Sequence, residues 1–573
     1  MRLAFLTPFL LVSVGTWPAT ADVAADAGSY LAGRSAFKAN DYGAAVEHFS
    51  EALASDPANL ALLESTGAAF LSLGDLENAA QVLERIVAAG ESSQIASLVL
   101  LGKAAQSEDW AGLLSALDDG RSVGPLFDNL SRPWANFGAG RMAEALEAFD
   151  AVAESENEST RIFGFYHKAL ALASAGDFEG SAHILSGDAG MVLRLPRRGV
   201  VAYAEVLSQL ERNDDALDLI AKSQNSSLVD PSLEALRARL EAGETIPFNS
   251  VRDARDGLAE VYHSIASALR QEPQRSYTLL FARMAATLRP DHIDALLLTA
   301  ELLEQLDQHD LATEVYDKVP RDHPKFHDAE MGRAEALRQS GQEGAAIEVL
   351  QQLAESHGHL LQVHVALADL FRELEMYEEA KAPYDNALSM ISEAMEQHWI
   401  IYFTRGIAHE RTGQWDLAEA DFRKALELKP DQPTVLNYLG YSLLELQTDL
   451  EEALALIERA IEQRPDAGHI IDSLGWGLYR LGRYAEAVPH MEEAAERLPT
   501  DPIVNDHLGD VYWAVGRHRE AEFQWHRALS FITDKTDQGD VDPDRIRRKL
   551  EVGLDAVLAE EGAPPLNVAN DGG

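Results

Sequence analysis

The chain of 573 residues contains no cysteine. This excludes disulfide bonds, thiolate metal ligands and thiol nucleophiles together, and it leaves the redox compartment open. Positive charge is also scarce, with 48 Lys and Arg against 94 Asp and Glu, which gives a net charge of −46. Such a chain repels phosphate groups, so nucleic acid and anionic membranes are not expected as its main partners. We interpret the acidity as a solubility feature of a surface-rich molecule or, alternatively, as a preference for a basic partner.

Motifs of the common enzyme classes are missing as well. There is no HExxH, no GxSxG, no P-loop and no GxGxxG that follows a strand pattern. His323 and His327 have the i, i+4 spacing of a helical metal pair, but Pro324 between them indicates a turn. We interpret this pair and the densest histidine group as surface residues; that group is His357, His359 and His364. The sequence therefore predicts no catalytic, metal or cofactor site.

Long apolar runs are confined to the N-terminus. Arg2 precedes an apolar stretch from Leu3 to Val14, and small residues follow at Ala19 and Ala21. This order is typical of a signal peptide over residues 1–21 that is cleaved after Ala21. The stretch is too short to span a bilayer comfortably, and no cysteine follows to carry a lipid. We expect an exported, periplasmic protein that has neither a transmembrane segment nor a lipid anchor.

Three copies of one two-helix pattern fill residues 433–531. Each copy has a Leu-Gly pair in its first helix and an alanine in its second: Leu439-Gly440 with Ala453, Leu474-Gly475 with Ala487, and Leu508-Gly509 with Ala521. The two later copies are 34 residues apart. This period and these small residues resemble the tetratricopeptide repeat. We predict an all-α, right-handed superhelical solenoid of about fourteen such helix pairs.

Departures from the period divide the chain. We expect an N-terminal sub-array over 22–230, an irregular joint over 231–258, and a C-terminal sub-array over 259–531. The joint is suggested by the turn formers Thr245, Pro247 and Asn249. Residues 532–560 are predicted to form a linker and a capping helix that begins at Pro543, and residues 561–573 a disordered tail.

In repeats of this type, one face of each first helix lines a concave groove. The resemblance places the following aromatic, amide and acidic residues there: Asn437, Tyr441, Asp472, Trp476, Tyr479, Asp506, Asp510 and Trp513. We predict that they bind a protein or peptide segment that is neutral or basic, because the acidic row would repel an anion. The alternative is that some of these aromatic side chains only fill the space between helices.

At finer grain, the segments NYLGYSL (437–443), DSLGW (472–476) and DHLGDVYWAVGR (506–517) resemble large envelope repeat proteins of Gram-negative bacteria. That group includes lipoprotein adaptors that deliver substrates to carboxy-terminal processing proteases. The resemblance implies a non-catalytic scaffold that presents envelope proteins to a periplasmic protease. The alternative is an assembly factor of a polysaccharide-export or outer-membrane machine. This chain departs from the adaptors because it lacks the lipid-bearing cysteine.

Overall fold

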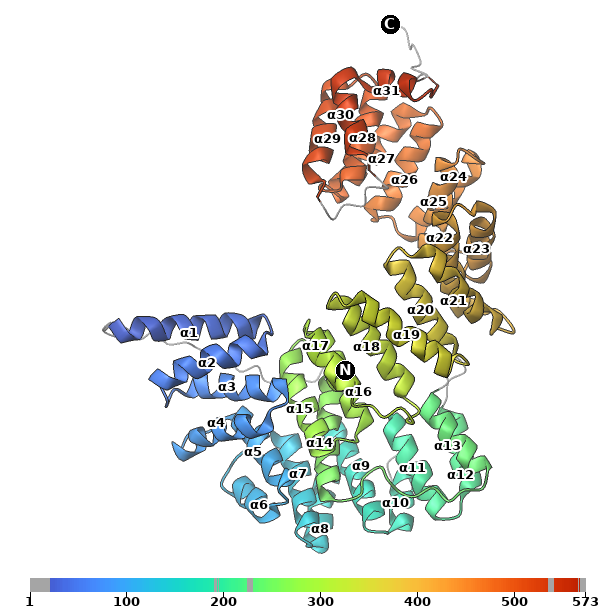
Figure 1. Ribbon diagram of the computed structural model, residues 1–573. Coiled ribbons are helices and arrows are strands. Elements are labelled where there is room, and N and C mark those ends of the chain that lie inside the picture. The colour runs from blue at the N-terminus through green and yellow to red at the C-terminus, as the bar shows by residue number, and fades with distance from the viewer. Residues whose placement is uncertain are drawn as a thin grey trace. The chain divides into compact units, whose positions relative to one another are not determined.

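The computed structural model describes residues 21–564 and 566, apart from 190–192, 194, 224–229 and 534–540. Every regular element in this part of the chain is a helix, which confirms the all-α prediction (Figure 1). The chain divides into two compact units, residues 1–356 and 357–573, here called the N-terminal and C-terminal units. The predicted signal peptide lies outside the described residues except for Ala21, and most of the predicted tail lies outside them too. No described helix has the length and apolar character needed to span a bilayer.

The N-terminal unit contains six consecutive helix pairs, a single helix and three further pairs. They are α1 (Ala21–Lys38), α2 (Tyr42–Ser55), α3 (Leu60–Leu73), α4 (Leu76–Ala88), α5 (Gln94–Gln106), α6 (Trp110–Asp118), α7 (Pro125–Gly138), α8 (Met142–Ala153), α9 (Glu158–Ser174), α10 (Phe178–Leu185), α11 (Arg197–Gln209), α12 (Asn213–Ser223), α13 (Pro231–Glu241), α14 (Ala254–Leu269), α15 (Arg275–Leu288), α16 (Ile293–Glu304), α17 (His309–Tyr316), α18 (Phe326–Gln339) and α19 (Glu343–His357).

The C-terminal unit contains five pairs and two terminal helices. They are α20 (Leu361–Glu373), α21 (Tyr377–Ser389), α22 (Trp399–Arg411), α23 (Trp415–Leu428), α24 (Pro433–Glu445), α25 (Leu450–Gln463), α26 (Gly468–Arg480), α27 (Tyr484–Arg497), α28 (Pro502–Ala514), α29 (His518–Phe531), α30 (Pro543–Val552) and α31 (Leu554–Glu560), with a 3-10 turn at Glu396–His398. In chain order, the described residues thus contain fourteen pairs, as the repeat period predicts.

Local sequence explains where these helices begin and how closely they pack. Asp41, Asn59 and Asp75 precede α2, α3 and α4, and each side chain accepts a hydrogen bond from a backbone N–H of the first turn. A glycine in the first helix lets the second helix approach. A Cβ atom added at Gly33 would lie 2.6 Å from the Phe49 ring. The helix pair is therefore specified by residues within one repeat.

The groove of the N-terminal unit is filled by the chain itself. Helices α14 and α15 lie along α3, α5, α7 and α9, the first helices of the early pairs (Figure 1). The Tyr262 hydroxyl donates to the carbonyl oxygen of Leu98 at 2.6 Å, and Arg283 Nε donates to the carbonyl oxygen of Ser72 at 2.9 Å. Both donors belong to the later helices, so two parts of the sequence more than 160 residues apart form one core.

The segment 231–258, which we expected to be irregular, begins with a helix. Asp230 caps α13, Pro231 occupies its first turn, and the buried leucines 233, 236 and 240 face the array. The extended stretch that follows is also held in place: Glu205 accepts hydrogen bonds from the backbone N–H groups of Asn249 and Ser250, at 3.2 and 3.0 Å. The expectation of irregular backbone is thus wrong for residues 231–241. The whole segment lies inside the N-terminal unit, and the two units divide after Ser356.

The end of the C-terminal unit has two short helices where we expected one. Gly553 separates α30 from α31 with a φ of 84°, a conformation that favours glycine. The missing side chain also leaves room for an indole, because a Cβ atom at Gly553 would lie 2.5 Å from Trp513 Cζ2. The break between α30 and α31 therefore lets this segment pack against Trp513 of the last repeat.

Candidate partner-binding site

The aromatic residues predicted for the groove on α26 are largely covered by other parts of the chain. The Trp476 ring stacks on Tyr479 and on His507, with centroid distances of 4.8 and 4.0 Å. Its Nε1 donates to Glu445 at 2.7 Å, and both Trp476 and Tyr479 are buried. The space-filling alternative therefore applies to these two rings, because neither offers a free face of useful area.

Asp472 is likewise paired within the unit. It is buried, and its carboxylate lies 3.1 Å from His507 Nδ1. Burial alone would lower the pKa of His507, but the neighbouring carboxylates, Asp472 above all, outweigh it and raise the pKa. The imidazole is thus favoured as a donor to Asp472, and this aspartate is not available as a free contact.

Asp506 and Asp510, on successive turns of α28, already hold a lysine. Lys549 Nζ lies 2.9 Å from both carboxylate oxygens of Asp506 and 2.6 Å from Asp510 Oδ1. Trp525 Nε1 also donates to Asp510, at 2.9 Å. The Lys549 side chain is 0% exposed, so its ion pairs with the two aspartates are buried away from water rather than on the surface. The acidic row binds an ammonium group that α30 of the same chain supplies.

Trp513 completes this covered end of the unit. Its Nε1 donates to Asp555 of α31 at 3.0 Å, and its ring stacks on His518 at 4.2 Å. The structure thus brings together six of the eight predicted residues in one continuous region and covers them with side chains of the same chain.

The other two predicted residues, Asn437 and Tyr441 on α24, are half-buried and remain accessible at their surfaces. The Asn437 Oδ1 atom is buried without a hydrogen-bond partner in the structure. A buried amide oxygen normally accepts a hydrogen bond, so this oxygen is an unsatisfied acceptor. The accessible part of the predicted site therefore lies on α24.

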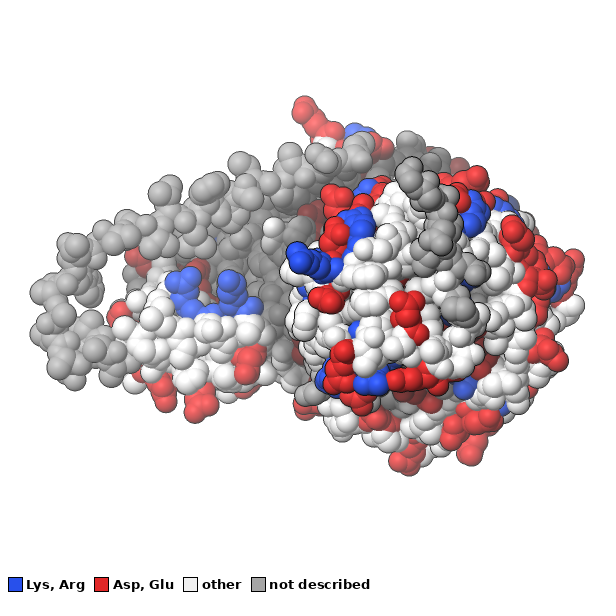
Figure 2. Space-filling model, turned by 90° about the horizontal axis from the view of Figure 1, so that it is seen from above, with Lys and Arg blue, Asp and Glu red and all other residues white. Residues whose placement is uncertain are grey.

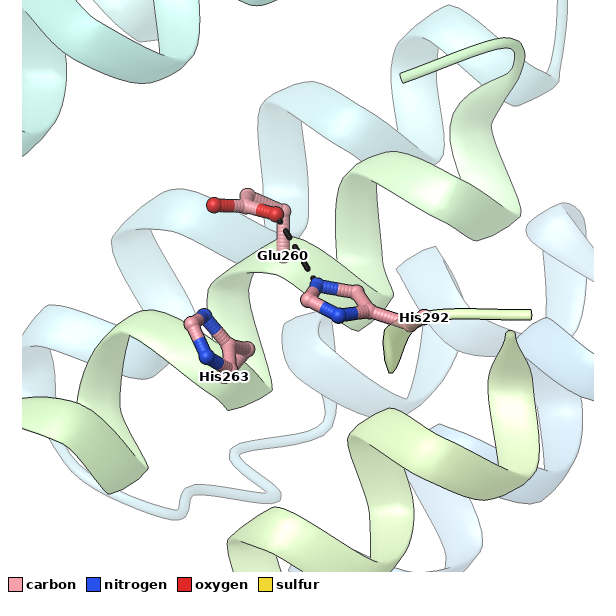
Figure 3. Close-up of side chains that lie close together, drawn as sticks. All are labelled: Glu260, His263 and His292. Carbon is pink, nitrogen blue, oxygen red and sulfur yellow. Dashed lines mark hydrogen bonds and ion pairs between the residues drawn. The ribbon is translucent and has the colours of Figure 1, made fainter. Parts of the chain in front are cut away.

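Sequence reasoning missed a second cluster, which lies in the N-terminal unit. Glu260 and His263 lie on successive turns of α14, and His292 precedes α16 (Figure 3). His292 Nε2 lies 3.2 Å from Glu260, and Arg198 donates to the same carboxylate through Nε and Nη2, at 3.0 and 2.6 Å. The Tyr166 hydroxyl donates to it as well, at 3.1 Å. The signal in the sequence was weak, since these residues come from four separate helices or turns.

The ligand atoms of Glu260, His263 and His292 lie within 4.8 Å of one another, which is close enough for a metal. The chemistry does not fit one. His292 Nδ1 accepts the backbone N–H of Ala295 at 3.1 Å, so the ring proton of the neutral imidazole is on Nε2, which faces Glu260. A cation there would need the opposite tautomer and would lie beside the Arg198 guanidinium. We conclude that the arrangement suits a hydrogen-bonded ion network.

Burial and neighbouring charges together set the charge states in this network. It lowers the pKa of His263 to about 3, which keeps that imidazole neutral near pH 7. Burial would raise the pKa of Glu260, but Arg198 and His292 outweigh it and hold the pKa well below its ordinary value. A cavity of about 650 Å³ lies beside the network, with Phe163 and Leu297 among its apolar walls. The charged lining of the cavity nearly balances, with Arg197, Arg198, Arg270 and Lys325 against Glu260, Asp294 and Glu301.

The histidine pair considered from the sequence is not a site. His327 is buried in the first turn of α18, so the expectation that it lies at the surface is wrong. Helix α18 packs against α17, the second helix of the preceding pair, so His327 belongs to a packed helix rather than to the turn between repeats. His323 lies in the turn before α18 and is half-buried.

Comparison with known families agrees with this architecture. A family model described as Tetratricopeptide repeat matches residues 30–93, 365–433, 403–468 and 473–531, and a second model of the same description matches residues 294–325. Both units therefore contain tetratricopeptide repeats, which confirms the repeat prediction. Repeats of this class imply a scaffold for protein–protein interaction.

Two bacterial proteins are similar over part of their length. The chain is 26% identical over 157 residues to the TPR repeat-containing protein PA4667 of Pseudomonas aeruginosa, which covers 27% of this chain and 26% of that protein. It is 31% identical over 128 residues to the Lipoprotein NlpI homolog of Haemophilus influenzae, which covers 22% of this chain and 40% of that protein. The chain thus spans less than half the length of either relative.

Solved structures of repeat proteins align at low similarity. The APC/C hetero-tetramer Cut9-Hcn1 aligns over 92% of this chain and 96% of that chain, with 16% identity and a TM-score of 0.37. A tetratricopeptide repeat protein from Parabacteroides merdae aligns over 45% of this chain and 97% of that chain, with 17% identity and a TM-score of 0.37.

Proposed function

We propose that the C-terminal unit binds a neutral or basic segment of a partner protein along the first helices of its pairs. The main support for this proposal is that the ammonium group of Lys549 donates hydrogen bonds to the carboxylates of Asp506 and Asp510. It supports the inference that the acidic row on this face favours a basic side chain. Asn437 and Tyr441 extend the same face away from the covered end and supply an unpaired amide oxygen and aromatic area.

We further propose that this scaffold acts in the periplasm as an adaptor that presents envelope proteins to a protease. The N-terminal sequence is typical of an exported protein, and one of its relatives is a lipoprotein by name. A repeat array that holds a protease and its substrate at the same time raises their effective concentration, without any chemistry of its own. The absence of recognisable catalytic motifs agrees with such a role.

The test begins with crosslinking in the intact cell envelope and identification of the captured proteins. Capture of a protease together with a substrate supports the adaptor, and addition of the purified chain should then accelerate cleavage of that substrate. Unchanged cleavage would rule out the adaptor role, and capture of a large membrane complex would favour the assembly factor instead.

The surface is tested with a pair of tyrosine variants. Tyr441→Ala should weaken partner capture by about tenfold, in keeping with the loss of one aromatic contact at an interface. Tyr377→Ala is the matched control, because Tyr377 begins α21, a second helix of its pair. Equal capture by both variants would place the partner elsewhere.

A further inference from the structure

We propose that α30 and α31 are a displaceable internal ligand, and that the surface they cover on α28 and α29 is a binding site for a lysine on a helical segment of a partner protein. This inference rests on the proposed role as a protein-binding scaffold and specifies one of its surfaces. The site consists of Asp506, Asp510 and the Trp525 indole, and Lys549 shows the geometry of the bound side chain.

The contacts select lysine over arginine. Lys549 Nζ has three N–H donors, and three carboxylate oxygens lie within 2.9 Å of it. The same nitrogen lies 5.6 Å from the centre of the Trp525 ring, which adds a cation–π contact. A planar guanidinium is larger than an ammonium group and spreads its donors over a rigid fork, so it does not match a compact site that converges on one atom.

Several features indicate that α30 and α31 can leave the array. Their lengths are ten and seven residues, and helices this short are not stable alone in water. Their strongest surface ion pairs, Arg545 with Glu561 and Arg548 with Glu560, connect the two helices with residues at their own end of the chain. Attachment to the array depends on Lys549, on the Arg545–Asp510 ion pair at 3.6 Å, on the hydrogen bond from Trp513 to Asp555, and on four buried apolar side chains: Val541, Ile546, Leu554 and Val557. Segments at a chain end open without global unfolding more readily than the core of an array does.

Opening leaves a site that needs a cation. Asp506 and Asp510 contact the same nitrogen atom, so without Lys549 two carboxylates would face each other across the space it filled. Like charges this close are unfavourable, and a second ammonium group relieves the repulsion. The partner is therefore identified by its chemistry as a helix that carries one lysine on an apolar face.

A labelled peptide of residues 541–562, the α30–α31 segment, is the probe, and the full-length chain is the receptor. In wild type the internal helix competes with the peptide. The Lys549→Ala chain weakens that competitor and leaves the acidic row intact, so it should bind the peptide at least about tenfold more tightly. A peptide carrying Lys549→Arg should bind the Lys549→Ala chain about tenfold more weakly than the native peptide does.

Two chain variants serve as controls. Arg547→Ala removes an exposed charge of α30 whose ion pair among the described residues is with Asp544 of the same helix, and its peptide affinity should equal that of wild type. Adding Asp506→Asn and Asp510→Asn to Lys549→Ala should abolish the gain in affinity. Circular dichroism and hydrogen exchange of α28 show whether each variant keeps the last repeat folded.

The proposal is overturned if the peptide binds the wild-type and Lys549→Ala chains equally, or if neutralising the two aspartates has no effect. A wild-type chain that dimerises through exchanged α30 helices would also overturn it, because the occupant would then be a second copy. Loss of peptide binding while the crosslinked partner is still captured would reject this site and leave the proposed function standing.

Discussion

The two units cover the first helices of their repeats in different ways. In the N-terminal unit, α14 and α15 supply Tyr262, Phe281 and Met284, all at most 3% exposed, against the early helices. In the C-terminal unit, one ten-residue helix inserts Lys549 between two aspartates. Exposing these apolar side chains to water is unfavourable, so α14 and α15 are part of the core. The ammonium group of Lys549 can be replaced by that of another lysine, so α30 can be exchanged for a partner helix.

The distribution of charge agrees with this division. Acidic side chains are spread over the visible face in Figure 2, with basic ones among them, and do not gather into one patch. The net charge of −46 is thus spread over the surface, whereas the Asp506 and Asp510 pair is a local arrangement of two carboxylates around one ammonium group.

The largest effect is expected for Phe281→Ala. Phe281 packs against Phe127, Tyr262 and Tyr277, with ring centroids 6.4, 6.1 and 5.2 Å away. Loss of a buried phenylalanine leaves a cavity and should lower the free energy of unfolding of the N-terminal unit by about 3–5 kcal/mol. Segment-resolved hydrogen exchange in urea measures this, with α3, α5 and α7 losing protection together with α15.

The matched control is Phe523→Ala, since Phe523 is 61% exposed on α29 and should change stability by less than about 0.5 kcal/mol. If Phe281→Ala loosened α15 alone, α14 and α15 would be an attached segment like α30, and the contrast between the units would disappear.

A smaller effect separates two glycines that serve the same packing role. A Cβ atom at Gly164 would lie 2.6 Å from the backbone nitrogen of Ala153, whereas one at Gly475 would meet Met491 Cγ at 2.7 Å. Backbone cannot move aside locally, but a methionine side chain can change rotamer. Gly164→Ala should therefore cost about 1–3 kcal/mol, and Gly475→Ala should fall at or below the lower end of this range. Urea unfolding followed by circular dichroism measures both, and equal costs would show that the side-chain neighbour is as rigid as the backbone one.

The repeat period predicted the fold because the packing of each pair depends on residues within one repeat. The alanines predicted at the contact points, Ala453, Ala487 and Ala521, are all fully buried. The return of α14 and α15 into the groove could not be predicted in this way, because a local period says nothing about contacts such as that of Tyr262 with Leu98. The helix at 231–241 did have a signal, Asp230 followed by Pro231 and regularly spaced leucines, but the turn formers after it dominated the interpretation.

The acidic and aromatic residues of the candidate site could be named from the sequence, but the side chains of the same chain that cover them could not. Asp506 and Asp510 stand out in the sequence because they occupy repeat positions expected to line a groove. The burial of Lys549 could not be recognised, since a lysine in a highly charged helix is normally solvated. The burial of Trp476 was hidden too, because its stacking partner His507 comes from the next repeat at a position that carries no family signature.

The smallest effect is a difference in pH dependence between the two units over about pH 6 to 8. In the N-terminal unit, burial lowers the pKa of His263 to about 3 and that of His167 to about 4, below the ordinary 6.5. As the pH falls below about 6.5, the opened state takes up protons that the folded state does not, so stability decreases. In the C-terminal unit the pKa of His507 is raised, so its contribution is complete below about 6.5 and is lost as the pH rises through the folded value.

Hydrogen exchange at several pH values, corrected for intrinsic rates, should therefore show α28 losing protection toward alkaline pH while α14 loses it toward acid. The His507→Gln chain supplies the control, because its α28 should no longer respond in this range while α14 keeps its slope. Slopes of the same sign in both helices would mean that the Asp472 carboxylate does not raise the pKa of His507 enough to outweigh burial, and the two units would then not differ in this respect.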